Sequence, residues 1–250
     1  MNQIKAIGFD LFNTLITADP GALSEAMQRL TTSLEESGFQ FEAEPFRKAY
    51  REAAIRFVTE SKANGRETHN RFWISEALIS LGQKVTPGDP SIAKAVEAYF
   101  SAFFDYCRLI PKTLEMLEQL QGRYRLGLLS NFTHAPAVEG LLDQFGLAPF
   151  FETILVSGEI GYRKPHPLVF EMLVNNLGFE SYQILYVGDS LDPDVLGATQ
   201  SGLRPVWMTY VRDNRLPSIP VPPSESDGIL SQGVPRVSDW EAFLSLLQQS

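Results

Sequence analysis

The stretch Ile4–Leu15, which reads IKAIGFDLFNTL, joins a short apolar segment to an abrupt polar end. Its apolar part has the length and composition of a buried β-strand, and this strand is expected to end at Asp10. A carboxylate at that place is held rigidly at the edge where open α/β sheets bind their ligands. Asp10 is therefore the first candidate functional residue, and an aspartate that caps a turn is the structural alternative.

Short apolar segments of the same kind recur later in the chain, and each follows a segment with helical periodicity. This alternation is typical of a parallel sheet that is covered by helices on both faces. Right-handed crossovers would place the carboxyl ends of all strands along one edge. The expected strands are 124–129, 153–156, 183–187 and 205–210, and the helices before them are 113–121, 138–145, 167–177 and 194–201.

Between Asp19 and about Arg108 the alternation stops, and the pattern indicates helices only. A glycine directly after three of them is a typical signal for a helix C-terminus. We therefore expect an α/β fold, with a three-layer α/β/α Rossmann-like core and a parallel sheet, plus an inserted α-helical cap domain. The core would be 1–16 and 109–250, and the cap 17–108. The expected cap helices are 23–37, 44–62, 68–81 and 91–106.

The overall composition limits the class of protein. The chain has 250 residues, of which 44% are hydrophobic and 20% charged, so it is an ordinary globular sequence rather than a disordered or collagen-like one. The formal net charge of −9 disfavours binding to the phosphate backbone of nucleic acids. An acidic chain that binds an anion must therefore concentrate positive charge locally.

The sequence gives no sign of export or of membrane insertion. Its single cysteine, Cys107, excludes an intramolecular disulfide framework and suits a reducing compartment. The N-terminal residues lack the apolar region of a secretory signal, and no run of about 18 apolar residues is present. We expect a cytoplasmic protein without nucleic-acid or membrane partners. The proline-rich segment 216–232 is expected to form an extended surface loop.

Polar residues that could take part in binding or catalysis also follow other expected strands. Ser130 and Asn131 come directly after the strand 124–129 and could bind anion oxygens together with the N–H groups of the following helix. Lys164 precedes a proline-started helix, where it would be a fixed positive charge. A Ser–Asn helix cap and an exposed lysine are the structural alternatives.

The strand 183–187 is followed by the acidic sequence 188–194, GDSLDPD. Carboxylates at Asp189, Asp192 and Asp194 resemble the oxygen ligands of a hard cation such as Mg²⁺, which prefers an octahedral array and retains several waters. An acidic loop that caps a helix would give a similar sequence.

The four clusters are far more specific together than separately. In chain order they supply Asp10, then Ser130 and Asn131, then Lys164 and Pro165, then Gly188, Asp189 and Asp194. This order resembles the haloacid dehalogenase-like hydrolases of subfamily I, which carry a helical C1-type cap after the first motif. The resemblance extends over essentially the whole chain. It implies that Asp10 is the nucleophile and forms an aspartyl intermediate, that Ser130 binds the transferred group, and that Lys164 holds the nucleophile and the developing negative charge.

The resemblance also implies a Mg²⁺ cofactor and a small substrate, most simply a phosphate ester. Mg²⁺ would be held by Asp10, Asp189 and the backbone carbonyl of Phe12, with Asp194 and Ser190 supporting the loop and the metal shell. Substrate contacts are implied for Phe12, Asn13, Thr14 and Asn131. The sequence indicates no oligomeric state.

Phe12 departs from the family pattern. Phosphatases of this family have a second aspartate two residues after the nucleophile, which protonates the leaving group and then activates water. Here the position holds Phe12, which cannot transfer a proton. With the alternation of a strand, residues 10 and 12 would point to the same side, so Phe12 is expected to face the site. A lost general acid–base is worth about 10²–10⁴-fold in rate.

Three functional interpretations follow. The first is a Mg²⁺-dependent phosphatase of small phosphorylated metabolites, weak or biased toward good leaving groups, with His134 as a hypothetical substitute base. The second is a 2-haloacid dehalogenase, in which an aromatic residue at this position resembles Phe12 and no metal is needed. The third is a non-catalytic binding protein with the same fold. The retained Gly188-Asp189 acid motif favours the first interpretation over the second.

Overall fold

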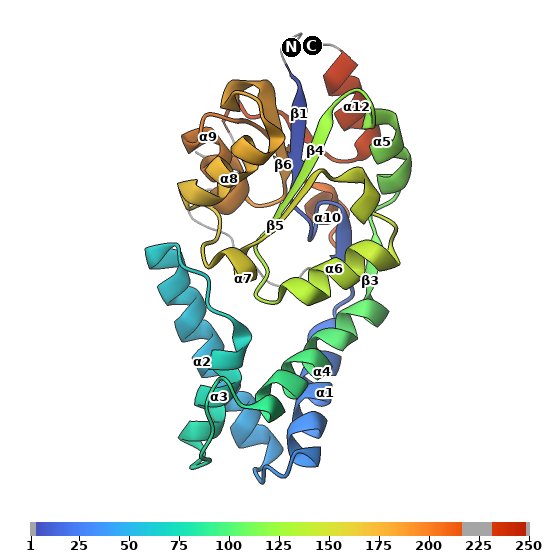
Figure 1. The fold of residues 1–250 in the computed structure, drawn as a ribbon. Helices are drawn as coiled ribbons and strands as arrows, with labels where there is room; N and C mark the ends of the chain where they lie inside the picture. The colour runs from blue at the N-terminus through green and yellow to red at the C-terminus, as the bar shows by residue number, and fades with distance from the viewer. Residues whose placement is uncertain (1–3, 217–231, 249–250) are drawn as a thin grey trace.

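The structure, a computed structural model, describes residues 4–216 and 232–248. Figure 1 shows a sheet with flanking helices and, below it, a second group of helices. The predicted loop 216–232 lies outside the described residues except for its two end residues. Within the described residues, no helix is long and apolar enough to cross a membrane.

Among the described residues, the core sheet has six strands in the order β5-β4-β1-β6-β7-β8, and all of their pairs are parallel. This confirms the predicted α/β fold with a parallel sheet. The central strand β1 is buried along its whole length because neighbouring strands and helices cover both of its faces. The strands are β1 (Ala6–Phe9), β4 (Arg125–Ser130), β5 (Thr153–Val156), β6 (Ile184–Gly188), β7 (Arg204–Met208) and β8 (Arg236–Val237).

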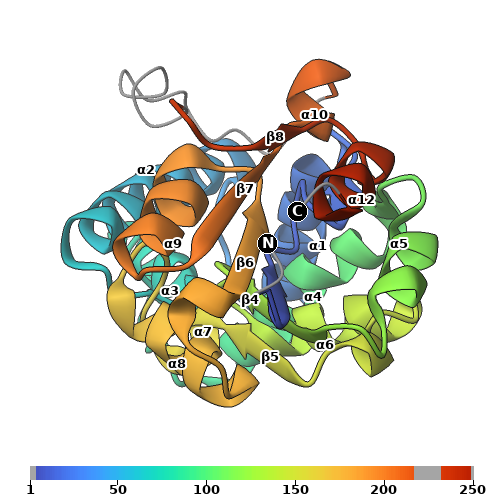
Figure 2. The ribbon, with the colours of Figure 1, turned by 90° about the horizontal axis from the view of Figure 1, so that it is seen from above.

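Helices cover the two faces of this sheet, as Figure 2 shows from above. On one face lie α5 (Thr113–Leu120), α6 (Ala135–Gln144) and α12 (Trp240–Gln248), and on the other lie α8 (Pro167–Leu177) and α9 (Gly197–Gln200). Shorter elements join them, namely η1 (Ala148–Phe150), α7 (Ser157–Ile160), η2 (Ser181–Gln183), the π-helix η3 (Leu191–Leu196) and α10 (Tyr210–Asp213).

Glycines let α8 approach the sheet closely. A Cβ atom on Gly8 of β1 would lie 2.8 Å from a methyl carbon of Leu173, and one on Gly127 of β4 would lie 2.7 Å from another. The side chain of Leu173 therefore fills the space that two neighbouring strands leave open. This close packing helps to fix the helix that begins just after Lys164.

The second group of elements contains α1 (Ala22–Glu36), α2 (Ala43–Asn64), α3 (Asn70–Ser80) and α4 (Pro90–Tyr106). Each end of these helices lies within two residues of the predicted bound. A two-stranded antiparallel sheet, β2 (Ile16–Ala18) with β3 (Cys107–Leu109), leads into and out of them. We call the segment 19–106 the cap. The predicted boundaries at 16/17 and 108/109 cross this small sheet, and the division into domains stays a prediction.

Some details differ from the sequence prediction. The helix expected over 194–201 starts earlier, as the π-helix η3 at Leu191, and continues as α9. The strand expected over 205–210 ends at Met208, because Tyr210 begins α10. Strands β2, β3 and β8 have only two or three residues, which is too short for a periodic pattern.

Candidate active site

Asp10 follows β1, the strand between β4 and β6. Phe9 is paired with Leu128 of β4 and with Val187 of β6, so the next residues of all three strands reach the same edge of the sheet. The Asp10 backbone N–H donates to the carbonyl of Val187 at 2.9 Å. The parallel register therefore brings three of the predicted clusters to one place, as the sequence predicts.

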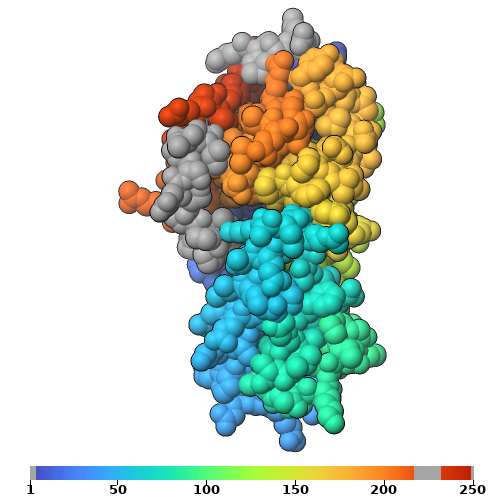
Figure 3. Space-filling model, turned by 90° about the vertical axis from the view of Figure 1, so that its left-hand side faces the viewer, coloured from blue at the N-terminus to red at the C-terminus, as the bar shows by residue number. Residues whose placement is uncertain are grey.

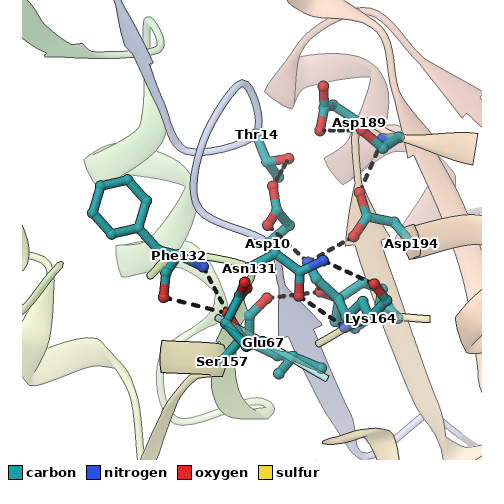
Figure 4. A network of polar contacts seen from close by, with 12 residues as sticks. Asp10, Thr14, Glu67, Asn131, Phe132, Ser157, Lys164, Asp189 and Asp194 are labelled. Atoms are coloured by element: carbon teal, nitrogen blue, oxygen red, sulfur yellow. Dashed lines mark hydrogen bonds and ion pairs between the residues drawn. The ribbon is translucent and has the colours of Figure 1, made fainter. Parts of the chain in front are cut away.

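Lys164 lies at the centre of this edge and is only 2% exposed. Its Nζ donates to Asp10 Oδ1 at 2.8 Å, to Asp194 Oδ1 at 2.7 Å and to the hydroxyl of Tyr186 at 2.8 Å (Figure 4). Burial alone would lower the pKa of Lys164, but the two carboxylates outweigh it and raise that pKa well above its ordinary value. Lys164 is therefore a charged, fully bonded ammonium group, and not an exposed surface lysine.

Tyr186 is a site neighbour that the sequence did not single out. Its hydroxyl accepts from Lys164 and donates to the carbonyl of Leu129 at 2.9 Å. Burial raises the pKa of Tyr186 well above its ordinary value, so the hydroxyl keeps its proton. In the sequence, the one hint of this contact is the tyrosine hydroxyl within an otherwise apolar strand, because a buried hydroxyl needs a hydrogen-bond partner.

Asn131 holds the backbone of Lys164 from both sides. Its Oδ1 accepts from the Lys164 N–H at 2.8 Å, and its Nδ2 donates to the Lys164 carbonyl at 2.9 Å. Both ends of the amide are thus used to fix the main chain that carries the ammonium group. A direct contact of Asn131 with substrate stays a prediction.

Three carboxylates gather beside Lys164. One oxygen each of Asp10, Asp189 and Asp194 lies within 4.8 Å of the others. Burial, followed by the charges of Asp10 and Asp194, raises the pKa of Asp189 well above its ordinary value. Burial also raises the pKa of Asp194 to about 6, although Lys164 opposes this shift. One ammonium group faces three carboxyl groups, so the site favours protonation of Asp189 unless a further positive charge is bound.

A divalent cation fits this donor set. Asp194 already gives Oδ1 to Lys164 and Oδ2 to the Ser190 N–H at 2.9 Å, whereas the Asp189 carboxylate accepts only a 3.2 Å bond from the Ser190 hydroxyl among the described contacts. Asp10 and Asp189 are therefore the carboxylates best placed to ligate Mg²⁺, with Asp194 and Ser190 in support. Coordination by the Phe12 carbonyl stays a prediction.

Gly188 makes room for this acidic loop. A Cβ atom at Gly188 would lie only 2.4 Å from Asp194 Cγ, which is shorter than any normal contact. The carboxylate of Asp194 therefore packs directly onto the backbone before Asp189. The Gly-Asp pair of the motif is explained by this contact.

Phe12 takes part in an aromatic cluster that joins the core to the cap. Its ring stacks on Phe132 with centroids 4.8 Å apart and meets Phe103 of α4 edge-on at 6.1 Å. Because β1 ends at Phe9, the alternation of a strand does not continue to residue 12, and the expected orientation toward substrate stays a prediction. The ring contacts that the structure describes for Phe12 are with other aromatic side chains.

The remaining predicted residues lie in the same region. Thr14 is fully buried, and its hydroxyl donates to Asp10 Oδ2 at 3.0 Å, so it orients the carboxylate. Asn13 has a left-handed backbone with φ of 60° and donates its N–H to Ile16 O at 2.6 Å, which forms the turn after Asp10. Ser130 is the buried last residue of β4. Substrate contacts of these residues stay predictions.

The described polar contacts of His134 are with residues of the cap and not with the acidic cluster. Its Nδ1 is 3.2 Å from His69 Nε2, its Nε2 is 3.1 Å from a Glu97 carboxylate oxygen, and its ring stacks on Phe100. His69, Glu97 and Phe100 all belong to the cap. The described contacts of His134 thus bind core to cap and give no geometric support to the hypothesis of a substitute base.

Residues 4–202 match the sequence model of the haloacid dehalogenase-like hydrolases. The chain belongs to this family. Among curated relatives of this hydrolase, a ribulose-1,5-bisphosphate 5-phosphatase of Halopiger xanaduensis is 30% identical over 206 residues, which cover 80% of this chain and 83% of the relative. A glyceraldehyde 3-phosphate phosphatase of Methanopyrus kandleri is 29% identical over 202 residues, covering 80% and 82%.

The fold of this haloacid dehalogenase-like hydrolase also resembles solved structures. A 2-haloacid dehalogenase of Pseudomonas syringae pv. Tomato DC3000 superposes with a TM-score of 0.71 at 20% identity, covering 98% of this chain and 99% of the other. At this identity the likeness concerns the fold alone. The chain is thus a hydrolase with an α/β Rossmann-like core, and its substrate must be argued from the site.

Proposed function

We propose that this hydrolase is a Mg²⁺-dependent phosphatase of small phosphorylated metabolites, with Asp10 as the nucleophile. The observation that carries the proposal is the joint position of Asp10, Lys164 and Asp189 at one sheet edge. The phosphatase names of the two curated relatives support the substrate class.

The charges of the site suit an anionic substrate only with help from cations. A phosphate group that approaches Asp10 brings negative charge to a nucleophile that is itself negative. Lys164 Nζ, 2.8 Å from Asp10 Oδ1, compensates part of that charge. Bound Mg²⁺ would supply the remaining positive charge at the phosphate oxygens. A displacement of halide has no comparable need for the acidic cluster.

With Asp10 as the nucleophile, phosphate ester hydrolysis would proceed in two displacements at phosphorus. The carboxylate of Asp10 forms a bond to phosphorus while the bond to the leaving oxygen breaks, which gives an aspartyl phosphate. Water then displaces the carboxylate from phosphorus, releases inorganic phosphate and restores Asp10. Thr14 orients the Asp10 carboxylate through Oδ2, and Ser130 would bind the transferred group. Positioning and charge compensation are the main sources of rate in such transfers.

The leaving group receives no proton from Phe12. Acyl and aryl phosphates leave as stabilised anions and need little protonation, whereas alkyl phosphates need it. We therefore propose a preference for acyl or aryl over alkyl phosphates. The aromatic surroundings of Phe12 are consistent with a site that lacks a proton donor there.

Phosphate release from a panel of aryl, acyl and alkyl phosphates tests the proposal. Turnover should require Mg²⁺, stop with EDTA and be lost in the variant Asp10→Asn, which keeps the size of the side chain. Equal turnover by wild type and Asp10→Asn would show that Asp10 is not the nucleophile. No turnover of any phosphate would reject the phosphatase.

A 2-haloacid dehalogenase is the second candidate, and Phe12 is the observation that favours it. In that reaction Asp10 would displace halide from carbon, and no proton donor at residue 12 would be needed. Halide release from 2-chloropropionate that continues in EDTA would support it. If the protein releases neither phosphate nor halide, the result favours a non-catalytic binding role. A cytoplasmic location stays a prediction.

A further inference from the structure

The loop between α2 and α3 of the cap pairs with the core segment that directly precedes Lys164. The Glu67 N–H donates to Gly161 O at 3.0 Å, and the Arg163 N–H donates to Gly65 O at 3.0 Å. An antiparallel bridge between Arg66 and Tyr162 lies between these two bonds. Figure 3 shows the cyan end of α2 and its loop resting on the yellow core segment. The cap thus holds the main chain one residue before the site lysine.

Glu67 anchors this pairing with a buried charge. Its side chain is 1% exposed, and it receives hydrogen bonds from the Ser157 hydroxyl at 2.7 Å and from Arg163 Nη1 at 3.3 Å. A carboxylate is costly to bury unless it is paired and hydrogen-bonded. Here the cap carries the acid and the core carries both of these partners. These bonds exist only while the cap lies on the core.

A second path leads from Glu67 to Lys164 through the loop after β4. The hydroxyl of Ser157 that donates to Glu67 also accepts from the Phe132 N–H at 2.9 Å. Phe132 follows Asn131, whose amide holds both the N–H and the carbonyl of Lys164. Figure 4 shows Glu67, Ser157 and Asn131 in one network with Lys164.

The contact between cap loop and core segment is close as well as polar. Gly65 ends α2 in the left-handed conformation, with φ of 71°, and a Cβ atom there would lie 2.6 Å from His166 Cδ2. Within the core, a Cβ atom at Gly158 would lie 2.4 Å from the Thr133 carbonyl oxygen, so the segment after Ser157 packs tightly on the loop after β4. Gly65 therefore lets the cap loop lie closer to the His166 side chain than a larger residue would allow.

We propose that Glu67 is a positioning residue through which the docked cap fixes the backbone of Lys164. One path runs through Arg163 and the paired backbone, and the other through Ser157, Phe132 and Asn131. The inference deepens the proposed function and rests on it, because Lys164 acts there on the transferred phosphate. Cap docking and the placement of the ammonium group are thus a single event.

The test compares Glu67→Gln and Glu67→Ala with Glu76→Gln. Glu76 is a matched control because it lies in the same part of the cap and pairs with Arg56 at the surface. With Mg²⁺ and a good aryl phosphate, kcat should fall about 10- to 100-fold in Glu67→Ala, the cost of a displacement of roughly 1 Å. Glu67→Gln should fall less, and Glu76→Gln should match wild type. A merely structural role would lower Tm in Glu67→Ala and leave kcat of the folded enzyme unchanged, which would overturn the proposal.

Hydrogen exchange separates this inference from the proposed function. The amides of Arg163 and Lys164 should exchange at least tenfold faster in Glu67→Ala than in wild type, whereas Asp10→Asn should leave the Arg163 amide protected. If wild type releases no phosphate, the proposed function fails and the exchange rates still decide the link between Glu67 and Lys164. Unchanged exchange at both amides in Glu67→Ala would overturn the link even in an active enzyme.

Discussion

Lys164 and Asp194 form an almost fully buried ion pair, with 2.7 Å between Nζ and Oδ1 and side-chain exposures of 1% and 2%. The same ammonium group is 2.8 Å from Asp10 Oδ1. Lys164 therefore compensates two carboxylates that belong to different strand ends. Its removal would leave both acids buried without a nearby positive charge.

Lys164→Ala should strongly destabilise the protein. Breaking a buried ion pair from one side costs about 3–5 kcal/mol, because the remaining charge stays desolvated. The free energy of unfolding from urea titrations measures the effect. Lys112→Ala is the control, since Lys112 pairs with Glu241 on the surface, where water screens such pairs and they contribute little to stability. A similar small loss in both variants would contradict the central role of Lys164.

Mg²⁺ should stabilise the folded protein through Asp189. A ligand that binds only the folded state adds about 2.7 kcal/mol at a concentration of 100 Kd. Thermal unfolding should therefore shift upward with MgCl₂ and return with EDTA in wild type. Asp189→Asn should lose most of the shift, whereas Asp192→Asn, in the same loop but exposed, should keep it. An equal shift in all three proteins would place the metal elsewhere.

Phe12→Asp should raise the turnover of alkyl phosphates more than that of aryl phosphates. The new carboxyl group could protonate the leaving oxygen, an effect worth about 10²–10⁴-fold when the geometry is right. The loss of the ring contacts with Phe132 and Phe103 should lower the unfolding temperature at the same time. The ratio of kcat/KM for alkyl and aryl substrates is the measurement.

Phe12→Ala separates the new acid from the lost ring. It removes the same aromatic contacts but adds no proton donor, so the alkyl-to-aryl ratio should stay as in wild type. If both variants change the ratio equally, the space left by the ring, and not protonation, is responsible. If neither does, the site does not use a proton donor at residue 12.

The residues of the acidic cluster could be predicted from the sequence because each follows an apolar strand. Parallel strands share one carboxyl edge, so Asp10 and Asp189 had to meet once β1 and β6 were neighbours. The position of Lys164 is predicted less directly, because this residue follows a loop and a short helix after β5. Its place in the sequence motif, rather than strand periodicity, indicated it.

Tertiary contacts account for what the sequence could not show. Glu67 lies nearly 100 residues before Arg163 and has no local pattern that separates it from a solvent-exposed glutamate. Tyr186 lies within an apolar strand, where its ring fits the pattern and only its hydroxyl is unusual. The bonds of both residues depend on which segments meet after folding, and local patterns in a single sequence do not contain that information.

The stability of the protein should fall as the pH drops from about 6.5 to about 4 because of His69. Burial, followed by the charges of His134 and Arg71, lowers the pKa of His69 from 6.5 to about 4. Between these pH values His69 is protonated in the unfolded chain but neutral in the folded protein, so proton binding stabilises the unfolded state and lowers the free energy of unfolding. The contribution is complete above pH 6.5 and is lost progressively toward pH 4. The carboxylate of Glu97 in α4 lies beside His134, the neighbour of His69.

His69→Asn isolates this effect, since asparagine can still accept the N–H of Arg71 at the start of α3 as His69 Nδ1 does. The variant should lose less unfolding free energy than wild type between pH 6.5 and pH 4, and the two slopes should agree above pH 7. Urea titrations at several pH values give the slopes directly. Parallel slopes over the whole range would show that His69 takes up its proton equally well in the folded and unfolded states, and that its contact with His134 does not penalise the charged ring.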